Sequence, residues 1–257
     1  MGALHRGHES LVEQACGEAN ALGLAAGCVV SIFVNPTQFN DPKDFARYPR
    51  TLEDDIERCT RSGASAIFAP SPEVMYPVGR TVRTPPLPRV ASGPGLEDAH
   101  RPGHFAGVCQ VVLRLFEVIQ PAAAVFGEKD WQQLQTVRAM TNVEMPSVRI
   151  VPGSTVREAD GLAMSSRNRF LSPPERARAA AISRALREAG RESTPTDAEV
   201  RMRRVLADAQ ITPEYAVVRD AQTLGPHDVS SGRPARALIA APVGSVRLID
   251  NAPWPGS

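Results

Sequence analysis

The chain has 257 residues, of which 42% are hydrophobic and 22% charged, a composition typical of a folded protein with an apolar core. Its 29 Lys and Arg residues nearly balance its 28 Asp and Glu residues, and the net charge of +1 argues against a nucleic-acid partner bound through a broad basic surface. No apolar segment reaches the roughly 18–20 residues of a membrane span, so we expect no membrane partner.

The four cysteines, Cys16, Cys28, Cys59 and Cys109, are widely spaced and each lies in an apolar stretch. We interpret them as reduced, buried thiols, because Cys is among the residue types most often buried and disulfide frameworks belong mainly to small secreted domains. The first residues lack the long apolar segment of a signal peptide. The predicted location is therefore cytoplasmic.

Helical and strand patterns alternate over the first 150 residues. Apolar residues recur with helical spacing in some segments and form short continuous runs in others. The predicted helices cover residues 9–22, 51–61, 105–119 and 131–141, and the predicted strands cover 28–34, 64–69, 122–126 and 148–151. This alternation predicts an α/β domain with a parallel sheet covered on both faces. Ligands of such sheets bind beyond the carboxyl ends of the strands.

The last hundred residues show helices first and strands afterwards. Ser172 and Glu175 form a capping box that opens a helix to about residue 189, and Thr196 with Glu199 opens another. Three short strands are predicted at 215–219, 237–241 and 246–249. This order predicts a smaller α+β domain. With a boundary near residues 152–156, the expected domains are 1–155 and 156–257.

Three polar motifs carry the chemistry. His5-Arg-Gly-His8 precedes the first helix and offers two imidazoles and backbone amides to a phosphate chain. Gly127-Glu-Lys-Asp130 follows a strand, and Met164-Ser-Ser-Arg-Asn168 supplies hydroxyls and a guanidinium. Each motif alone also has a plain structural interpretation, as an exposed loop, a capped turn or a polar loop. Together they favour a nucleotide site.

The first and third motifs resemble the two signatures of HIGH-type nucleotidyltransferases. Longer stretches resemble pantothenate synthetases (pantoate–β-alanine ligases) in family order, from Met1 to about Asn251. These stretches are Phe33-Val-Asn-Pro-Thr-Gln-Phe39, Arg47-Tyr-Pro-Arg-Thr51, Met75-Tyr-Pro77, Arg101-Pro-Gly-His-Phe105, Phe126-Gly-Glu-Lys-Asp130, the segment from Thr155 to Asn168, and Arg247-Leu-Ile-Asp-Asn251.

The resemblance implies a Rossmann-like amino-terminal domain with a smaller carboxyl-terminal lid domain, and an ATP-dependent ligase. The family activates (R)-pantoate with ATP, forming pantoyl adenylate and pyrophosphate. The amine of β-alanine then displaces AMP to give pantothenate. The resemblance also implies Mg²⁺ and a homodimer.

The resemblance further assigns roles to residues. His5 and His8 would stabilise charge on the ATP phosphates, with His8 as a proton donor, and Lys129 is the third catalytic candidate. The implied ATP-binding residues are Met1, Gly2, Ala3, Leu4, His5, Gly7, His8, Gly127, Glu128, Lys129, Asp130, Val156, Met164, Ser165, Ser166 and Arg167. The amides of Gln38 and Gln133 would bind pantoate or β-alanine, with Asn35 lining the same pocket.

Asp54 and Asp55 have two interpretations. Their position shortly after Thr51 fits acidic support for the amino end of a helix. The resemblance instead suggests a Mg²⁺ site at this acidic pair.

The chain departs from the family pattern at its start. In the family a strand and a Pro-Thr pair precede the Met-Gly-Ala-Leu-His stretch, whereas this chain begins at that Met. The expected sheet therefore lacks its first strand, which would uncover the edges of neighbouring strands. Two alternatives to an active ligase remain: another HxGH adenylyltransferase, and a truncated non-catalytic relative with residual ligand binding. Gln38 and Gln133 argue against the first, because nucleotide binding alone does not require them.

Overall fold

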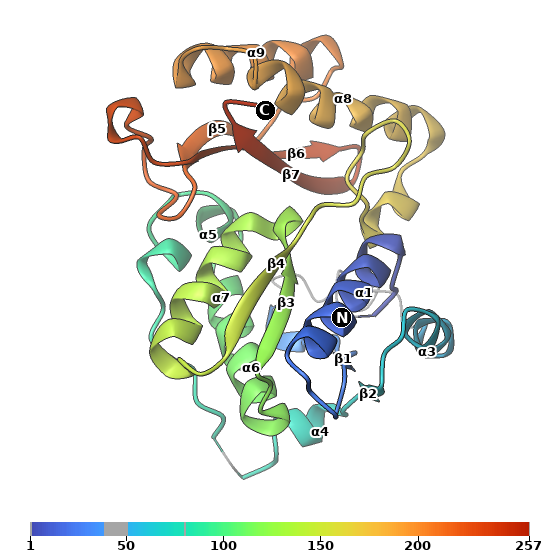
Figure 1. Ribbon diagram of the computed structural model, residues 1–257. Coiled ribbons are helices and arrows are strands. Elements are labelled where there is room, and N and C mark those ends of the chain that lie inside the picture. Colours follow the sequence, from blue (N-terminus) through green and yellow to red (C-terminus); the bar gives the residue numbers. More distant parts are fainter. Residues whose placement is uncertain (1, 39–50, 80, 257) are drawn as a thin grey trace. The chain divides into compact units, whose positions relative to one another are not determined.

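The computed structural model describes residues 2–38, 51–79 and 81–256, and the chain divides into two compact units (Figure 1). The first unit comprises Met1–Glu128 and Gln132–Ser154, and the second comprises Lys129–Trp131 and Thr155–Ser257. Of the predicted ATP-binding residues, Met1 lies outside the described residues. The predicted pantoate residue Gln38 has a described backbone but no described side chain.

The first unit contains alternating helices and strands, which confirms the predicted α/β character. Its helices are α1 (Arg6–Ala21), α3 (Leu52–Arg61), α4 (Pro72–Met75), α5 (Glu97–His100), α6 (His104–Ile119) and α7 (Trp131–Glu144), and its strands are β1 (Val29–Ser31), β2 (Ala66–Phe68), β3 (Ala123–Gly127) and β4 (Arg149–Gly153). Short 3₁₀ turns lie at Pro36–Gln38, Arg89–Ala91 and Glu128–Asp130. The core gathers around α6, whose inward stripe includes Val108, Val112 and Phe116.

The strands of the first unit form two separate parallel pairs. β1 pairs with β2 from Val29↔Ala66 to Ser31↔Phe68, and β3 pairs with β4. Within the described residues, β1 and β3 each pair on one edge only. β1 is three residues long, shorter than the predicted strand 28–34, because only residues 29–31 pair with residues of β2.

The second unit is a three-stranded antiparallel sheet covered by two helices. Its helices are α8 (Pro173–Ala189) and α9 (Pro195–Asp208), its strands are β5 (Tyr215–Asp220), β6 (Ala235–Val243) and β7 (Val246–Trp254), and 3₁₀ turns lie at Ser166–Phe170 and Val229–Ser231. α8 and α9 lie side by side on one face of the sheet (Figure 1), and the core fills the space between helices and strands. In neither unit is a described helix long and apolar enough to cross a bilayer.

Of the two capping predictions for the second unit, the one for α8 is confirmed and the one for α9 is wrong. At α8 the capping box is confirmed, because the Ser172 N–H donates to Glu175 Oε2 (2.8 Å). At α9 the prediction was wrong by two residues: Thr194, not Thr196, is the N-cap, and its Oγ1 accepts from the Asp197 N–H (3.1 Å). Pro195 then occupies the first helical position, which suits its fixed φ.

The cysteines are free thiols. Cys28, Cys59 and Cys109 are buried, as predicted, while Cys16 is half-buried and its Sγ donates to the carbonyl of Gly63 (3.2 Å). Burial raises the pKa of the Cys109 thiol to about 12.

The core of the second unit predicts a contrast between two positions of α9. Met202 is fully buried, whereas Val200 is 61% exposed. Met202→Ala should lower the free energy of unfolding by about 2–5 kcal/mol, because it removes buried apolar surface and leaves a cavity. Val200→Ala should change it by less than about 0.5 kcal/mol. Denaturant unfolding of both variants checks this, and equal effects would contradict the observed packing.

Candidate active site

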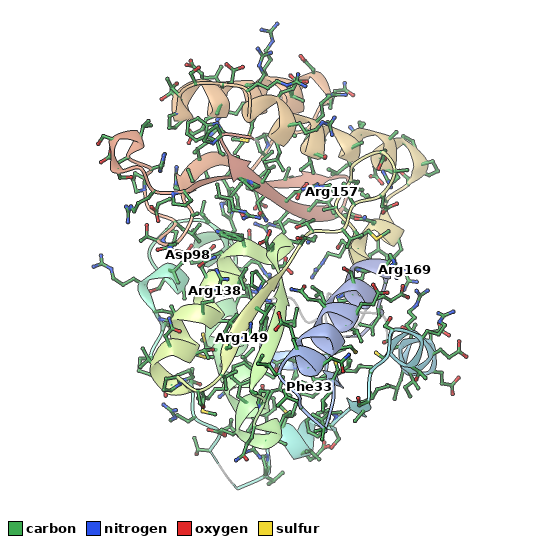
Figure 2. All side chains as sticks on the ribbon, viewed as in Figure 1. Phe33, Asp98, Arg138, Arg149, Arg157 and Arg169 are labelled. Carbon is green, nitrogen blue, oxygen red and sulfur yellow. The ribbon has the colours of Figure 1, made fainter. Side chains whose placement is uncertain are left out.

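The helix that carries the HxGH motif runs antiparallel to β4. Glu18, near the end of α1, pairs with Arg149 at the start of β4 (Oε2···Nη2 2.5 Å; Arg149 is labelled in Figure 2). One turn earlier in α1, Gln14 Nε2 donates to the carbonyl of Pro152, near the end of β4 (3.0 Å). The amino end of α1 therefore lies beyond the carboxyl ends of the strands, where parallel sheets bind ligands.

A glycine at the end of β4 allows α1 to approach the strand ends. Gly127 closes β3, Gly153 closes β4, and the two are opposite each other in the pair. A Cβ on Gly153 would lie 2.1 Å from Leu11 Cδ2, and one on Gly127 would lie 3.6 Å from Leu11 Cδ1. Gly153 thus has a packing role, whereas a side chain at Gly127 would make only ordinary van der Waals contact with Leu11.

His5 and His8 form a reciprocal cap at the start of α1. His5 is the N-cap residue, and its Nδ1 accepts from the Gly7 N–H (3.1 Å). The backbone N–H of His5 donates to Nδ1 of His8 (3.3 Å), and the two ring centroids are 4.1 Å apart. Since each Nδ1 is an acceptor, the proton of each neutral ring lies on Nε2. Both rings can therefore offer an Nε2–H donor.

Asp55 lies behind this cap rather than in a metal site. Its side chain is buried, and its two oxygens accept from consecutive backbone amides: Oδ2 from the Ala3 N–H (2.9 Å) and Oδ1 from the Leu4 N–H (2.7 Å). The Thr51 hydroxyl also lies 3.3 Å from Oδ1. Asp54 is exposed, and neighbouring residues of a helix point about 100° apart.

The acidic pair consequently does not fit a shared Mg²⁺ site. Both oxygens of Asp55 are engaged by the backbone, and Asp54 faces another direction. Among the described residues, no group of three or more His, Cys, Asp and Glu side chains is placed to hold a metal ion.

Asn35 is buried and uses its amide to organise a loop. Its Nδ2 donates to the carbonyl of Gly107 (3.1 Å), and its Oδ1 accepts from the Tyr76 hydroxyl (2.8 Å) and from Thr37. These bonds join the loop after β1 to α6. Asn35 therefore fixes the position of this loop against α6.

Sequence reasoning singled out Gln133 but missed its neighbour Gln132. Gln133 is half-buried on α7. Gln132 is buried, and its amide accepts from the Glu97 N–H (2.8 Å) and donates to the carbonyl of Val90 and to Asp98 Oδ1 (both 2.9 Å). Gln132 thus fixes the loop 90–98 onto α7. No local pattern marks it, because its partners are more than 30 residues away.

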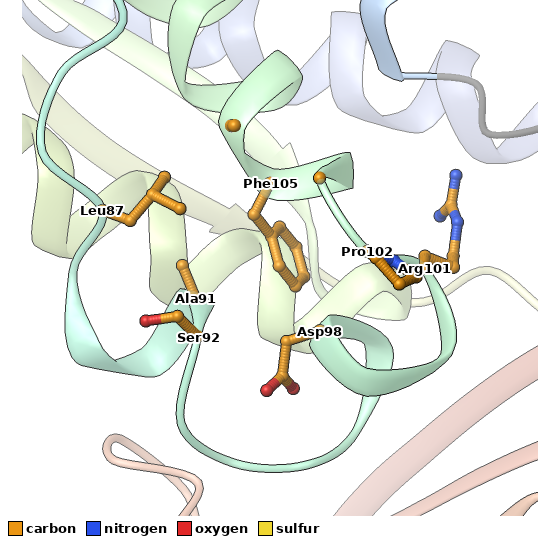
Figure 3. Close-up of a pocket in the computed structure, with 9 residues that line it drawn as sticks. Leu87, Ala91, Ser92, Asp98, Arg101, Pro102 and Phe105 are labelled. Carbon is orange, nitrogen blue, oxygen red and sulfur yellow. The ribbon is translucent and has the colours of Figure 1, made fainter.

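A pocket of about 260 Å³ opens beside this loop (Figure 3). Its lining includes Leu87, Asp98 and Phe105, and none of the predicted site residues. Burial would raise the pKa of Asp98, but the hydrogen bonds from Gln132 and from the amides of Leu96 and Gly95 outweigh it and lower the pKa.

In the second unit, Lys129 and Trp131 are fixed by residues of the sheet. Asn251 Nδ2 donates to the carbonyl of Lys129 (2.8 Å), and Asn251 Oδ1 accepts from Arg236 Nε (2.5 Å). The Arg236 guanidinium stacks 3.5 Å from the centre of the Trp131 ring. Lys129 Nζ lies 3.5 Å from Asp130 Oδ1. Residues of the sheet thus fix the Lys129–Trp131 turn through the carbonyl of Lys129 and the ring of Trp131.

The motif at residues 164–168 follows a short hairpin. Backbone bonds join Met164 to Val156 and Glu158 to Leu162 (N···O 2.9 and 2.8 Å), and Gly161 lies at the tip with φ +91°. Ser165 then caps a 3₁₀ turn, its Oγ accepting from the Arg167 N–H (3.2 Å).

Two arginines anchor the hairpin through ion pairs. Arg176 of α8 pairs with Asp160 and with Glu158 (Nη2···Oε2 3.0 Å). Arg157, labelled in Figure 2, makes two bonds to the buried Asp250 of β7 (2.6 and 3.1 Å). These ion pairs therefore fix the hairpin that contains Val156 and leads into Met164–Arg167.

The predicted site residues fall into two groups, one in each unit. The first unit brings together Gly2, Ala3, Leu4, His5, Gly7, His8, Gly127 and Glu128 around the amino end of α1, with Asn35 and Gln133 elsewhere in that unit. The second unit carries Lys129, Asp130, Val156, Met164, Ser165, Ser166 and Arg167.

Comparisons with known proteins agree on one family. The sequence profile of the pantoate-beta-alanine ligase family matches residues 1–253. A pantothenate synthetase of Nocardioides sp. is 48% identical over 261 residues, which cover 98% of this chain and 76% of that protein. The pantothenate synthetase of Myxococcus xanthus is 48% identical over 260 residues, covering 98% and 85%.

Solved structures give the same result. The crystal structure of pantothenate synthetase from Thermus thermophilus has a TM-score of 0.87 and 42% identity, covering 98% of this chain and 90% of that one. A pantoate-beta-alanine ligase from Francisella tularensis, complexed with beta-gamma ATP and beta-alanine, has a TM-score of 0.78 and 31% identity, covering 100% and 88%.

The anchored hairpin predicts acid sensitivity. The hydrogen bond from Arg176 lowers the pKa of Asp160. A carboxyl with a lowered folded-state pKa stabilises the fold above its unfolded pKa of about 3.9 and loses that contribution as the pH falls through the folded pKa. Asp160→Asn should therefore lower Tm at pH 7, and the difference from the parent should shrink below about pH 4.

Arg176→Met provides the matched background for this test. In that background the effect of Asp160→Asn on Tm should depend less on pH, because the largest cause of the lowered pKa is gone and only the backbone hydrogen bonds, such as that from the Leu162 amide, remain. A pH dependence as large without Arg176 as with it would disprove the assignment.

Proposed function

The chain belongs to the pantoate-beta-alanine ligase family, and we propose that it condenses (R)-pantoate with β-alanine to form pantothenate, AMP and pyrophosphate through a pantoyl-adenylate intermediate. The observation that carries this proposal is the family match over residues 1–253, which includes the HxGH cap at the amino end of α1. The match with the ATP- and β-alanine-complexed ligase supports the choice of substrates.

In the first step, a carboxylate oxygen of pantoate attacks the α-phosphorus of ATP. A new O–P bond forms, the bond from the α-phosphorus to the bridging oxygen breaks, and pyrophosphate leaves with that oxygen. Negative charge grows on the phosphate oxygens during this step, so preformed N–H donors lower the barrier.

His5 and His8 supply such donors at the amino end of α1. Their Nδ1 atoms accept backbone N–H bonds, which places the proton of each neutral ring on Nε2. The amide dipoles of the helix add positive potential at the same end. We assign His8 as the proton donor of the pair, its Nε2–H donating a hydrogen bond to the phosphate oxygens, and His5 as its partner in charge stabilisation. Gly2, Ala3, Leu4 and Gly7 would line the nucleotide beside them.

The resemblance assigns further nucleotide roles to residues of the second unit. Lys129 would supply a point charge to the phosphates, and Asp130 would accept from ribose hydroxyls. Val156 would contact the adenine. Met164–Arg167 would supply hydroxyl and guanidinium donors to the phosphates. Arg176 and Asp250 anchor the preceding hairpin through ion pairs, which supports a defined conformation for this segment.

In the second step, the amine nitrogen of β-alanine attacks the acyl carbon of pantoyl adenylate. The C–N bond forms, the C–O bond to the phosphate breaks, and AMP leaves with one oxygen of the original carboxylate. The amine loses a proton. The amides of Gln38 and Gln133 would orient pantoate for both steps, because an amide can donate to its carboxylate and accept from its hydroxyls.

We propose that ATP enters as its Mg²⁺ complex, in which the ion neutralises phosphate charge. Mg²⁺ usually keeps several waters and binds through substrate phosphates together with one or two carboxylates. The geometry of Asp54 and Asp55 does not support a shared ion at that pair. We also propose that the enzyme is cytoplasmic and homodimeric, as the family resemblance implies.

The two alternatives have less support. The non-catalytic alternative is not favoured, because the named relatives are enzymes and the chain matches them along almost all of its length. Another HxGH adenylyltransferase is not favoured either, because the family profile is that of the ligase.

Loss of the proposed proton donor should be severe. His8→Ala should lower the rate of pyrophosphate release with ATP and pantoate by roughly 100-fold or more, the scale for removing one preorganised donor. His100→Ala, at an exposed position, is the matched control and should leave the rate within about twofold. A near-parental rate in His8→Ala would remove His8 from the mechanism.

The order of steps predicts the fate of the pantoate oxygen. ATP and pantoate should release pyrophosphate without β-alanine. With ¹⁸O in the pantoate carboxylate, mass spectrometry should find one labelled oxygen in AMP after β-alanine is added. Unlabelled AMP would exclude the acyl-adenylate route and with it the proposed function.

A further inference from the structure

The carboxylate of Asp55 bridges two parts of the first unit that are more than 50 residues apart. It lies in the first turn of α3 and is 1% exposed. Its oxygens accept from the Ala3 and Leu4 amides at 2.9 and 2.7 Å. A carboxylate that accepts two backbone N–H groups is a charge-assisted pair, stronger than neutral hydrogen bonds.

The backbone at Ala3 explains why a carboxylate is needed there. Ala3 has φ +55°, in the left-handed region that residues with a side chain seldom occupy. A left-handed residue can turn successive amides toward one side and so create a concave site for an anion. The oxygens of Asp55 fill that site. Such a backbone conformation persists only where surrounding contacts maintain it.

The fixed turn leads directly into the catalytic cap. Leu4 is followed by His5, the N-cap of α1, whose backbone N–H donates to His8 and whose Nδ1 accepts from Gly7. The direction of the chain at Ala3–Leu4 therefore sets where His5 begins the helix. Through the reciprocal cap, it also sets the orientation of both imidazoles.

Contacts with α1 fix the position of α3, the helix that carries Asp55. Arg58 Nη1 pairs with Glu9 Oε1 (2.6 Å), and Cys16 Sγ donates to the carbonyl of Gly63 just after α3 (3.2 Å). Burial would raise the pKa of Glu9, but Arg58 and Arg6 outweigh that effect and lower it. The two helices are thus joined at two levels along α1, in addition to the Asp55 contacts before it.

We propose that Asp55 is a positioning residue, which holds the Ala3–Leu4 turn so that His5 and His8 face the triphosphate of the nucleotide. The inference rests on the proposed function, since it takes the two imidazoles to be the phosphate-side donors. It assigns Asp55 to the protein backbone rather than to a metal ion. It gives Asp54, its exposed neighbour, no part in the site.

The test compares Asp55→Asn with Asp54→Asn. Asn at position 55 keeps the size of the side chain but turns an N–H₂ toward one of the two amide donors, so one bond is lost. We expect Asp55→Asn to lower kcat for pyrophosphate release by about 100-fold, the scale of a misplaced catalytic group, with a smaller change in the KM for pantoate. Asp54→Asn should stay within about twofold of the parent.

Two further measurements separate positioning from other roles. The Mg²⁺ concentration for half-maximal rate should be the same in Asp55→Asn as in the parent, whereas a metal-ligand role would raise it in both variants. Thermal melting checks folding. If Asp55→Asn does not fold, Ala3→Gly is added, because glycine adopts the left-handed turn without strain. The double variant should fold and remain slow, and a parental rate in it would overturn the proposal.

Binding of a non-hydrolysable ATP analogue distinguishes the failure of this inference from the failure of the proposed function. A parent chain that binds the analogue but releases no pyrophosphate would refute the proposed function alone. Weaker binding in Asp55→Asn than in Asp54→Asn would then still support positioning, and equal binding would overturn it. A parent that binds no analogue would refute both, since no nucleotide site would exist.

Discussion

The bond between the Asp55 carboxylate and the amides of Ala3 and Leu4 is the constraint on which the proposed chemistry depends. The two imidazoles of the HxGH motif lie at the very start of a helix, where the preceding chain has no helical bonds of its own. A buried carboxylate from another helix replaces those bonds. The His5–His8 cap is therefore ordered by a contact across 51 residues of sequence, rather than by the motif alone.

The other face of α1 depends on a steric constraint. Gly153, at the end of β4 and opposite Gly127 of β3, leaves room for Leu11 where a side chain would collide with it. Polar contacts at Gln14 and Glu18 fix the direction of the helix along β4. Together with Asp55, these contacts determine both the position of α1 and the direction of its first residues. The proposed phosphate-binding role of the motif thus depends on packing as well as on residue type.

Much of the fold could be predicted from the sequence, because helices and strands have local signatures. The stripe from Phe105 to Phe116 predicted α6, and the Ser172–Glu175 capping box gave the start of α8 correctly. The start of α9 was placed two residues late, since Thr194 and Thr196 are both acceptable caps and only Pro195 distinguishes them. β6 and β7 extend to nine residues each, longer than predicted, because pairing between them recruits residues with little strand character of their own.

The candidate site was less predictable, since its supporting contacts are long-range. The positions of Asp55, Gln132 and Asn251 as organisers of backbone segments have no local signature. Amide hydrogen exchange at Ala3 and Leu4, followed by NMR, tests the central claim most directly. In Asp55→Asn the amide that faces the N–H₂ group should exchange at least about tenfold faster than in the parent, because it has lost its acceptor, while in Asp54→Asn both amides should match the parent. Equal exchange in all three proteins would contradict the claim that Asp55 orders the start of the HxGH helix.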